Sequence, residues 1–127
     1  MRSTLISMLA VLLLAVGICL VSVTLTGRIT DEIEDMRAGV LRLTEEGNME
    51  EAHALLGRMA EEWEARERLL EVLAPHESLH EITCLIIESE ANLTAGDPDD
   101  FNRSMSLMGE ALHHLYLEEL PRLTNIL

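Results

Sequence analysis

The chain has no lysine and almost no aromatic residues. All nine basic residues are therefore arginines, whereas 23 residues are acidic, and the formal net charge is −14 at pH 7. A surface of this sign repels phosphate groups, which excludes nucleic acid as a partner. Aromatic residues make up only 2% of the chain. A hydrophobic core must therefore be filled by Leu, Ile and Met.

Cysteine is scarce, and signals for β-strands are missing. Cys19 lies in a long apolar run and Cys84 lies far from it in a different segment, so no disulfide is implied. We find no alternating strand pattern, no glycine-rich phosphate loop and no low-complexity linker. These absences leave an all-helical chain as the expected fold class.

The first 27 residues form an apolar segment. No charged residue occurs from Ser3 to Gly27, and about twenty apolar residues are enough to cross a bilayer. The apolar region of a cleaved signal peptide is shorter, about 7–15 residues, and Thr24-Leu25-Thr26 is a poor cleavage site. We therefore expect residues 1–27 to be an uncleaved, single-pass signal anchor whose residues 3–27 lie in the lipid bilayer of the cell membrane.

The orientation of this anchor is harder to predict. Arg2 and the amino terminus favour a cytoplasmic N-terminus, but Arg28, Arg37 and Arg42 follow the span closely, so the positive-inside rule is ambiguous. A two-residue charged tail before a long apolar run is typical of a signal anchor. We therefore expect a cytoplasmic N-terminus and an extracytoplasmic acidic domain, residues 28–127, which contains every acidic residue.

This acidic domain carries the periodicity of amphipathic helices, with apolar residues at steps of three and four. Nothing forces a break after the span, so the first of these helices is expected to continue out of it. Short connections between four helices predict antiparallel neighbours around one core, that is, a small antiparallel four-helix bundle. The expected helices are 28–46, 48–74, 76–95 and 98–120. The expected core residues are Ile29, Ile33, Met36, Val40, Leu43, Ala52, Leu55, Leu56, Met59, Trp63, Leu70, Leu73, Leu79, Ile82, Ile86, Leu93, Phe101, Met105, Met108, Leu112 and Leu115.

Residues at the ends of these helices have familiar roles. Gly47 is a natural helix terminator because glycine tolerates a left-handed backbone. Asn48 is predicted to cap the next helix, with Glu51 as its capping-box partner. Asp97 is predicted to cap the fourth helix, and Pro121 is predicted to end it.

The segment His76-Glu77-Ser78-Leu79-His80 matches the zinc-protease motif H-E-x-x-H. In such enzymes two imidazoles one helical turn apart hold zinc and the glutamate acts as general base. The extended form of the motif fails, since Thr83 stands where glycine is required and Ile86 where the third histidine belongs. A zinc-dependent hydrolase that uses Glu77 is therefore kept only as an alternative.

A metal site without hydrolysis is a further alternative. If the third and fourth helices are antiparallel, His80 lies level with His113 and His114, and His76 lies level with Glu118. Imidazoles and carboxylates at one level of a bundle resemble a site for zinc or another divalent ion. The candidate ligands are His76, His80, His114 and Glu118, and the corresponding function is an extracytoplasmic cation-binding sensor module. The same histidines are equally compatible with a solvent-facing role.

Several stretches together resemble a known family. They are "EEWEARERLLEVL" around Trp63, the His-led "HESLHEITCLI", and the closing "LTNIL". In this order, behind an N-terminal anchor, they resemble domain-of-unknown-function family 4363, small membrane-anchored helical proteins of Gram-positive bacteria. The resemblance implies a family histidine at His76 but none at His80. It also implies an accessory role beside multi-span membrane proteins, without an established activity.

The function expected from these observations is a non-enzymatic, membrane-tethered helical bundle that serves a membrane protein partner in the cell envelope. The C-terminal "RLTNIL" is the candidate contact, because apolar residues beyond Pro121 are expected to have left the helix. The candidate partner-binding residues are Leu123, Asn125, Ile126 and Leu127. Self-association into a homo-oligomer remains open, and no cofactor is expected apart from the zinc alternative.

Overall fold

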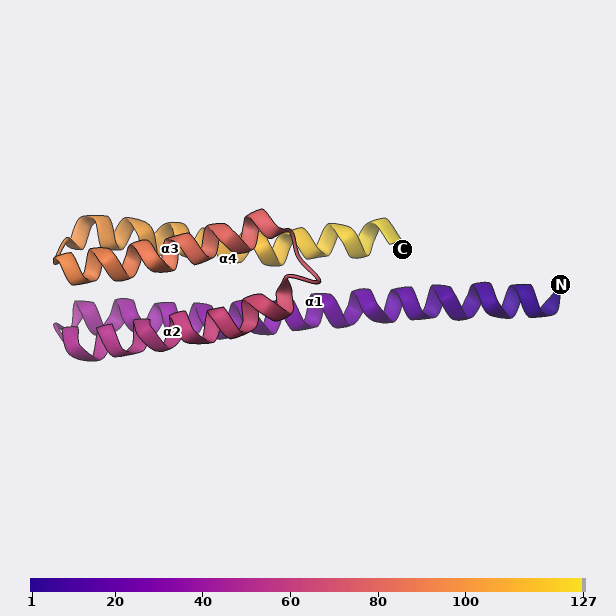
Figure 1. Ribbon diagram of the computed structural model, residues 1–127, viewed down its shortest axis with the longest axis horizontal. Coiled ribbons are helices and arrows are strands. Elements are labelled where there is room, and N and C mark those ends of the chain that lie inside the picture. Colours follow the sequence, from indigo (N-terminus) through magenta and orange to yellow (C-terminus); the bar gives the residue numbers. More distant parts are fainter. Residues whose placement is uncertain (127) are drawn as a thin grey trace.

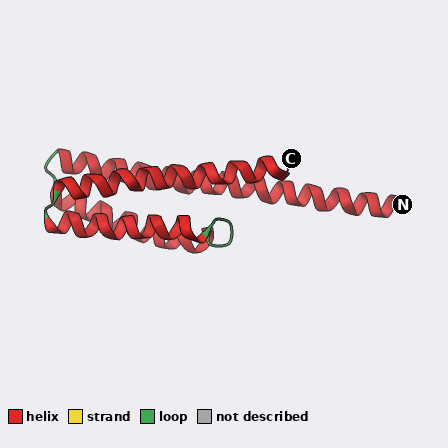
Figure 2. Cartoon of the chain, turned by 90° about the horizontal axis from the view of Figure 1, so that it is seen from above, coloured by secondary structure: helices red, strands yellow, loops and turns green. Residues whose placement is uncertain are grey.

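The computed structural model describes the backbone of residues 1–126 and the side chains of residues 1–117. Within these residues there is no strand, and four helices follow one another: α1 (Arg2–Glu45), α2 (Met49–Leu70), α3 (His76–Ala95) and α4 (Pro98–Ile126). The helices run alternately up and down, and each packs against two neighbours in the ring α1–α2–α3–α4 (Figures 1 and 2). The predicted all-α class and the antiparallel four-helix arrangement are confirmed.

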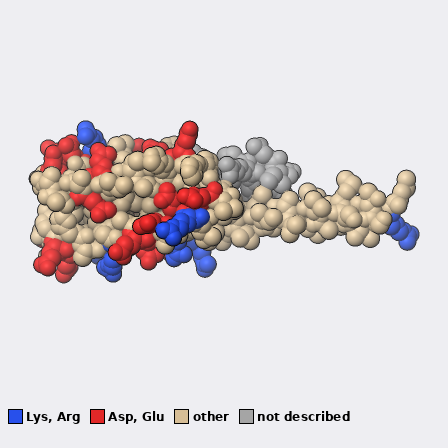
Figure 3. Space-filling view, viewed as in Figure 1, with Lys and Arg blue, Asp and Glu red and all other residues tan. Residues whose placement is uncertain are grey.

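Helix α1 has two parts with different surroundings. Its 44 residues correspond to a rod about 66 Å long, and its N-terminal part extends far beyond the other helices (Figure 1). This extension bears exposed apolar side chains such as Leu12 and Leu14, and no acidic group is visible on it in Figure 3. Helix α1 is long and apolar enough to cross a membrane. Packing inside the bundle begins with Ser22 and Thr26, which are both buried.

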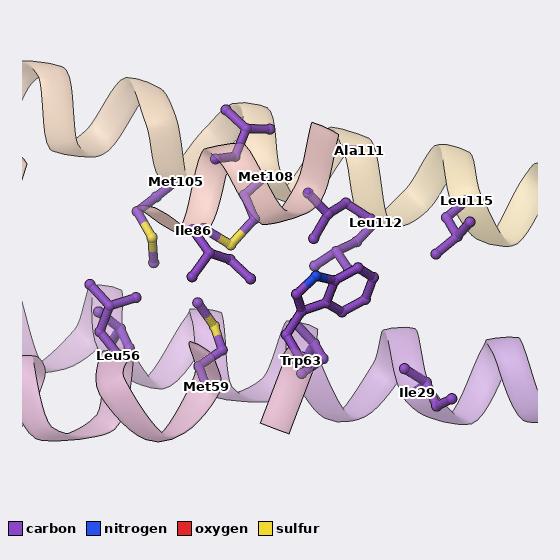
Figure 4. Packing of buried hydrophobic residues seen from close by; sticks show 14 of the residues in the cluster. Ile29, Leu56, Met59, Trp63, Ile86, Met105, Met108, Ala111, Leu112 and Leu115 are labelled. Carbon is purple, nitrogen blue, oxygen red and sulfur yellow. The ribbon is translucent and has the colours of Figure 1, made fainter. Parts of the chain in front are cut away.

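The core of the bundle consists of aliphatic and sulfur-containing side chains around one tryptophan. Trp63 is only 2% exposed, and Figure 4 shows its indole reaching from α2 toward Leu112 of α4. Methionine fills the space near it, because its flexible side chain adapts to irregular gaps. All of the expected core residues are buried or half-buried, so the predicted apolar stripes are confirmed.

The turns at the end of the bundle away from the extension follow the predicted chemistry in part. Gly47 has φ 82° and Gly96 has φ 71°, the left-handed conformation that glycine adopts at low cost. Asp97 Oδ1 accepts a hydrogen bond from the backbone N–H of Asp100 over 3.2 Å, as expected of a capping residue. Asn48 precedes α2, but its side chain makes no capping bond. The predicted capping box is therefore wrong. The physical reason is the backbone of Asn48, whose ψ of 67° departs from the extended conformation of a good cap.

Two helix ends differ from the predicted ones. Helix α2 ends at Leu70, and its chain then turns tightly, with the N–H groups of Leu73 and Ala74 both donating to the Leu70 carbonyl. Helix α4 continues past Pro121 to Ile126, so the prediction that Pro121 ends the helix is wrong. A proline inside a helix removes its own N–H donor and strains one turn. The helix on both sides can persist when the rest of it is held by packing.

Candidate functional site

The H-E-x-x-H segment forms the start of α3. Pro75 has an extended backbone, with ψ 132°, and α3 begins at the next residue, His76. The side chains of His76, Glu77 and His80 are all exposed. The side chain that the motif sends into the bundle is Leu79, which is 1% exposed. The chemically active residues of the motif therefore lie on the solvent side of α3.

Thr83, one turn after the motif, has a structural environment. Its Oγ1 accepts a hydrogen bond from Trp63 Nε1–H over 2.9 Å. The same hydroxyl lies 3.0 Å from Glu67 Oε1 and 3.1 Å from the carbonyl of Leu79, and it donates to one of these at a time. Thr83 thus connects α3 to α2. This role could not be predicted from the sequence, because it depends on how the two helices are rotated about their axes.

The predicted zinc ligands lie on two helices, His76 and His80 on α3 and His114 and Glu118 on α4. His80 Nε2 lies 3.5 Å from Cys84 Sγ on the same helix, and His114 is exposed on α4. Among the described side chains, no group of three or more His, Cys, Asp and Glu residues could hold a metal ion. The side chain of Glu118 is outside the described residues. The set of His76, His80, His114 and Glu118 therefore stays a prediction.

A hollow of about 240 Å³ lies between α1 and α4, and sequence reasoning missed it. It contains two carboxylates, one imidazole and one phenol, and its lining residues are Thr30, Asp31, Glu34, Gly109, Leu112, His113 and Tyr116. Two glycines let large side chains of the opposite helix approach closely here. The ring of Tyr116 covers Gly27, and the guanidinium of Arg37 covers Gly109. Glycines inside helices are the signal in the sequence that was available for this approach.

Arg37 fixes the electrostatics beside this hollow. Its guanidinium forms two hydrogen bonds with the carboxylate of Glu34, one of them from Nε over 2.7 Å. A third bond runs from Nη1 to the carbonyl of Met105 on α4 over 3.1 Å. The bond with Glu34 raises the pKa of Arg37 above its usual value, against the opposing effect of partial burial. Of the two carboxylates that line the hollow, Glu34 is therefore paired with Arg37 and Asp31 is not.

A second hollow, of about 360 Å³, lies at the end of the bundle away from the extension. Its lining is mostly apolar and includes Met49, Leu93 and Phe101; the other lining residues are Thr44, Glu45, Asn92, Gly96, Asp97, Pro98 and Asn102. Beside this hollow, a side-chain hydrogen bond to Asp97 raises the pKa of Asp100, and Arg103 acts in the opposite direction. An apolar side chain of a partner matches this hollow better than a metal ion does. We call it the distal hollow.

The predicted partner-binding residues lie at the end of α4. Leu123, Asn125 and Ile126 fall in the helix, but their side chains are outside the described residues, and Leu127 is outside them altogether. Their role in binding stays a prediction. The helical backbone up to Ile126 corrects only the expectation that these residues had left the helix.

Comparison with known protein families supports the resemblance seen in the sequence. The family model described as "Domain of unknown function (DUF4363)" matches residues 20–126. The chain belongs to this family. The DUF4363 match covers the whole bundle and the last part of the apolar segment of α1. No curated protein and no solved structure matches the chain. The family description states no activity, so inference about function has to start from the arrangement of the helices.

Proposed function

We propose that this DUF4363 protein is a non-enzymatic accessory protein, anchored in the cell membrane by α1, whose bundle binds a membrane protein partner outside the cytoplasm. One observation carries the proposal. Helix α1 is continuous from Arg2 to Glu45. It therefore joins an apolar, exposed rod directly to a packed bundle.

This continuity has a mechanical consequence. Leu14 and Ile18 are more than half exposed, whereas Thr26 and Ile29 are almost completely buried by the bundle, with no break in the helix between them. A helix without a linker holds the bundle at a fixed height and angle relative to the membrane. Such rigidity suits a protein that presents one surface to a neighbour in the same membrane. The acidic side chains spread over the bundle (Figure 3) favour a partner surface with basic residues.

The surroundings of the H-E-x-x-H segment also support an accessory role. Thr83 is engaged by Trp63 and Glu67, so this part of α3 contributes to packing between helices. The resemblance to the family implies the same accessory role, whereas the family match itself states no activity.

Photo-crosslinking in living cells tests the proposal. A photoreactive residue is placed in the full chain at Met49 in the distal hollow, at Ile87 on α3 or at Leu107 on α4, all of which are at least 44% exposed. We expect one of these faces to give a discrete adduct with a single membrane protein. Glu64, an exposed residue on α2, is the matched control position and should give none. The proposal fails if no position gives an adduct, or if every adduct is a second copy of this chain.

Removal of residues 123–127 tests the predicted contact at the C-terminus. If "RLTNIL" binds the partner, the shortened full-length chain should melt at an unchanged temperature and lose the adduct. A lower melting temperature with the adduct retained would instead assign these residues to the bundle.

A cation-binding sensor is the second candidate. The hollow between α1 and α4 offers two side chains for it, although no group of three or more His, Cys, Asp and Glu residues among the described side chains could hold a metal ion. Asp31 and His113 line this hollow on the helix that enters the membrane and on its neighbour. A zinc titration of the full chain distinguishes this site from the H-E-x-x-H segment. Binding lost in Asp31→Asn/His113→Ala would support the hollow, and binding lost in His76→Ala/His80→Ala would support the segment. Absence of stoichiometric zinc would remove zinc sensing at both.

A further inference from the structure

The connection between α2 and α3 lies at the end of the bundle that faces the extension of α1. Both other turns lie at the opposite end, and the two views agree on this (Figures 1 and 2). The connection contains Val72, which at 86% is the most exposed large apolar residue of the described bundle. A single exposed valine is ordinary on a protein surface. The exposure of Val72 is informative because this residue lies at the end of the bundle that faces the apolar extension of α1.

Side-chain contacts fix the height of this connection along α1. Arg66 Nη2 lies 3.3 Å from Glu32 Oε2, so residue 66 of α2 is level with residue 32 of α1. Because the two helices are antiparallel and have the same rise per residue, Leu70 is level with about Arg28. The chain after Leu70 then continues toward the N-terminal part of α1. Val72 is consequently level with the last uncharged residues before Arg28.

The thickness of a bilayer locates the membrane at the same height. The hydrocarbon layer corresponds to about twenty helical residues, and the uncharged segment of α1 extends from Ser3 to Gly27. Centred on this segment, the layer ends near Leu25. The separation between Leu25 and Arg28 is about 4.5 Å along the helix axis, which is less than the thickness of the headgroup layer.

Other exposed apolar residues occur at the same end. Leu69, in the last turn of α2, is 48% exposed, and Leu117 of α4 is 40% exposed. The packing of Tyr116 on Gly27 places Leu117 level with about Thr26. These side chains lie close to the level at which the exposed apolar surface of α1 begins, and lipid is near that level once α1 crosses the membrane.

We infer that the α2–α3 connection, with Val72 at its tip, rests in the headgroup layer of the membrane crossed by α1 and gives the bundle a second contact with lipid. This inference rests on the membrane anchor proposed above. It does not depend on which side of the membrane the bundle occupies. The second contact would stop the bundle from tilting about α1 and would fix which face it turns to a neighbour.

Spin labels on the full chain in phosphatidylcholine vesicles test this inference. In a background of Cys19→Ala/Cys84→Ser, a label is attached at Val72→Cys, at Leu12→Cys in the apolar segment, or at Met49→Cys. Met49 is the matched control, because it is an exposed apolar residue at the opposite end of α2. Collisions with oxygen report lipid, and collisions with a water-soluble nickel chelate report water.

We expect the oxygen-to-nickel collision ratio at Val72 to lie between the two others, clearly higher than at Met49 and lower than at Leu12, as for a label in the headgroup layer. A ratio at Val72 equal to that at Met49, with a lipid-like ratio at Leu12, would overturn the inference and leave the anchor in place. A water-like ratio at Leu12 would overturn both. Protection of Val72 from both reagents would show that protein covers it, which also contradicts lipid contact.

Discussion

The indole N–H of Trp63 donates a hydrogen bond to Thr83 Oγ1 over 2.9 Å, and this bond joins α2 to α3 at the edge of the core. Trp63 is the largest buried side chain, so its N–H needs a partner that replaces water. Thr83 supplies the partner from the face of α3 that follows the H-E-x-x-H segment. The segment therefore continues into a packing contact between two helices.

Thr83→Val is expected to destabilise the full chain. Valine keeps the shape of threonine but leaves the buried indole N–H of Trp63 unpaired, which costs about 1–3 kcal/mol of unfolding free energy. Unfolding in detergent micelles, followed by tryptophan fluorescence, measures the change. Thr94→Val on the same helix is the control, since Thr94 is exposed and bonds only to its own helix, and it should change stability by less than about 0.5 kcal/mol. Equal effects of the two substitutions would assign no special role to the Trp63 bond.

Gly109→Ala is expected to loosen the contact between α1 and α4. A Cβ at this position would lie 2.8 Å from Cζ of Arg37, so the guanidinium would have to move and lose its bond to the Met105 carbonyl. Gly57→Ala is the matched control, because nothing lies within 4 Å of its Cβ position. Alanine at Gly57 should stabilise the protein by about 0.5–1 kcal/mol through helix propensity.

The difference between these two alanine variants isolates the effect of Arg37. Gly109→Ala should be less stable than Gly57→Ala by about 1.5–3 kcal/mol, the magnitude of a hydrogen bond to a charged group. Thermal unfolding followed by circular dichroism gives both values. In an Arg37→Met background, Gly109→Ala should recover most of the difference. If it does not, the loss arises from the backbone of α4 and the guanidinium is not its cause.

The sequence predicted the helices well, because periodicity reports which face of a helix is buried. Ile29, Ile33 and Val40 follow this rule and all lie in the core. Buried polar residues do not follow it. Ser89 and Ser104 are hydrogen-bonded to each other over 3.0 Å between α3 and α4, and a serine in a helix pattern is read as solvent-facing unless its partner is known.

The hollows could not be predicted for a related reason. The hollow between α1 and α4 depends on Arg37 lying over Gly109 and Tyr116 lying over Gly27. These pairs are far apart in the sequence, and a rotation of either helix would separate them. The histidines of the H-E-x-x-H segment present the opposite case, a pattern that is visible in the sequence without its surroundings. Their spacing was visible in the sequence, but it does not show whether a third ligand is near them.

Thr26→Val is expected to stabilise the protein. Thr26 is fully buried, and among the described side chains its Oγ1 is a buried oxygen without a hydrogen-bond partner. Valine has the same branched shape and removes the unpaired hydroxyl, which should raise the unfolding free energy by about 1 kcal/mol. Thr30→Val is the control, because Thr30 Oγ1 donates to the carbonyl of Gly27 over 3.0 Å. A gain in both variants would show that β-branched apolar residues are simply favoured in this part of α1.

Cys84 offers a direct measurement of the orientation in the membrane. Its thiol is exposed on the bundle, whereas Cys19 lies in the apolar segment of α1. A charged maleimide that cannot cross the membrane should therefore label intact cells at Cys84 if the bundle is extracytoplasmic. Cys84→Ser should abolish this labelling, and Cys19→Ser should leave it unchanged.

Labelling of Cys84 only after the cells are made permeable would place the bundle in the cytoplasm. The anchor and the lipid contact of Val72 would both survive that result, because each depends only on the height of the bundle along α1. The extracytoplasmic partner would not survive it. The arginines that follow the span, Arg28 first among them, would then have set the orientation, as the positive-inside rule describes.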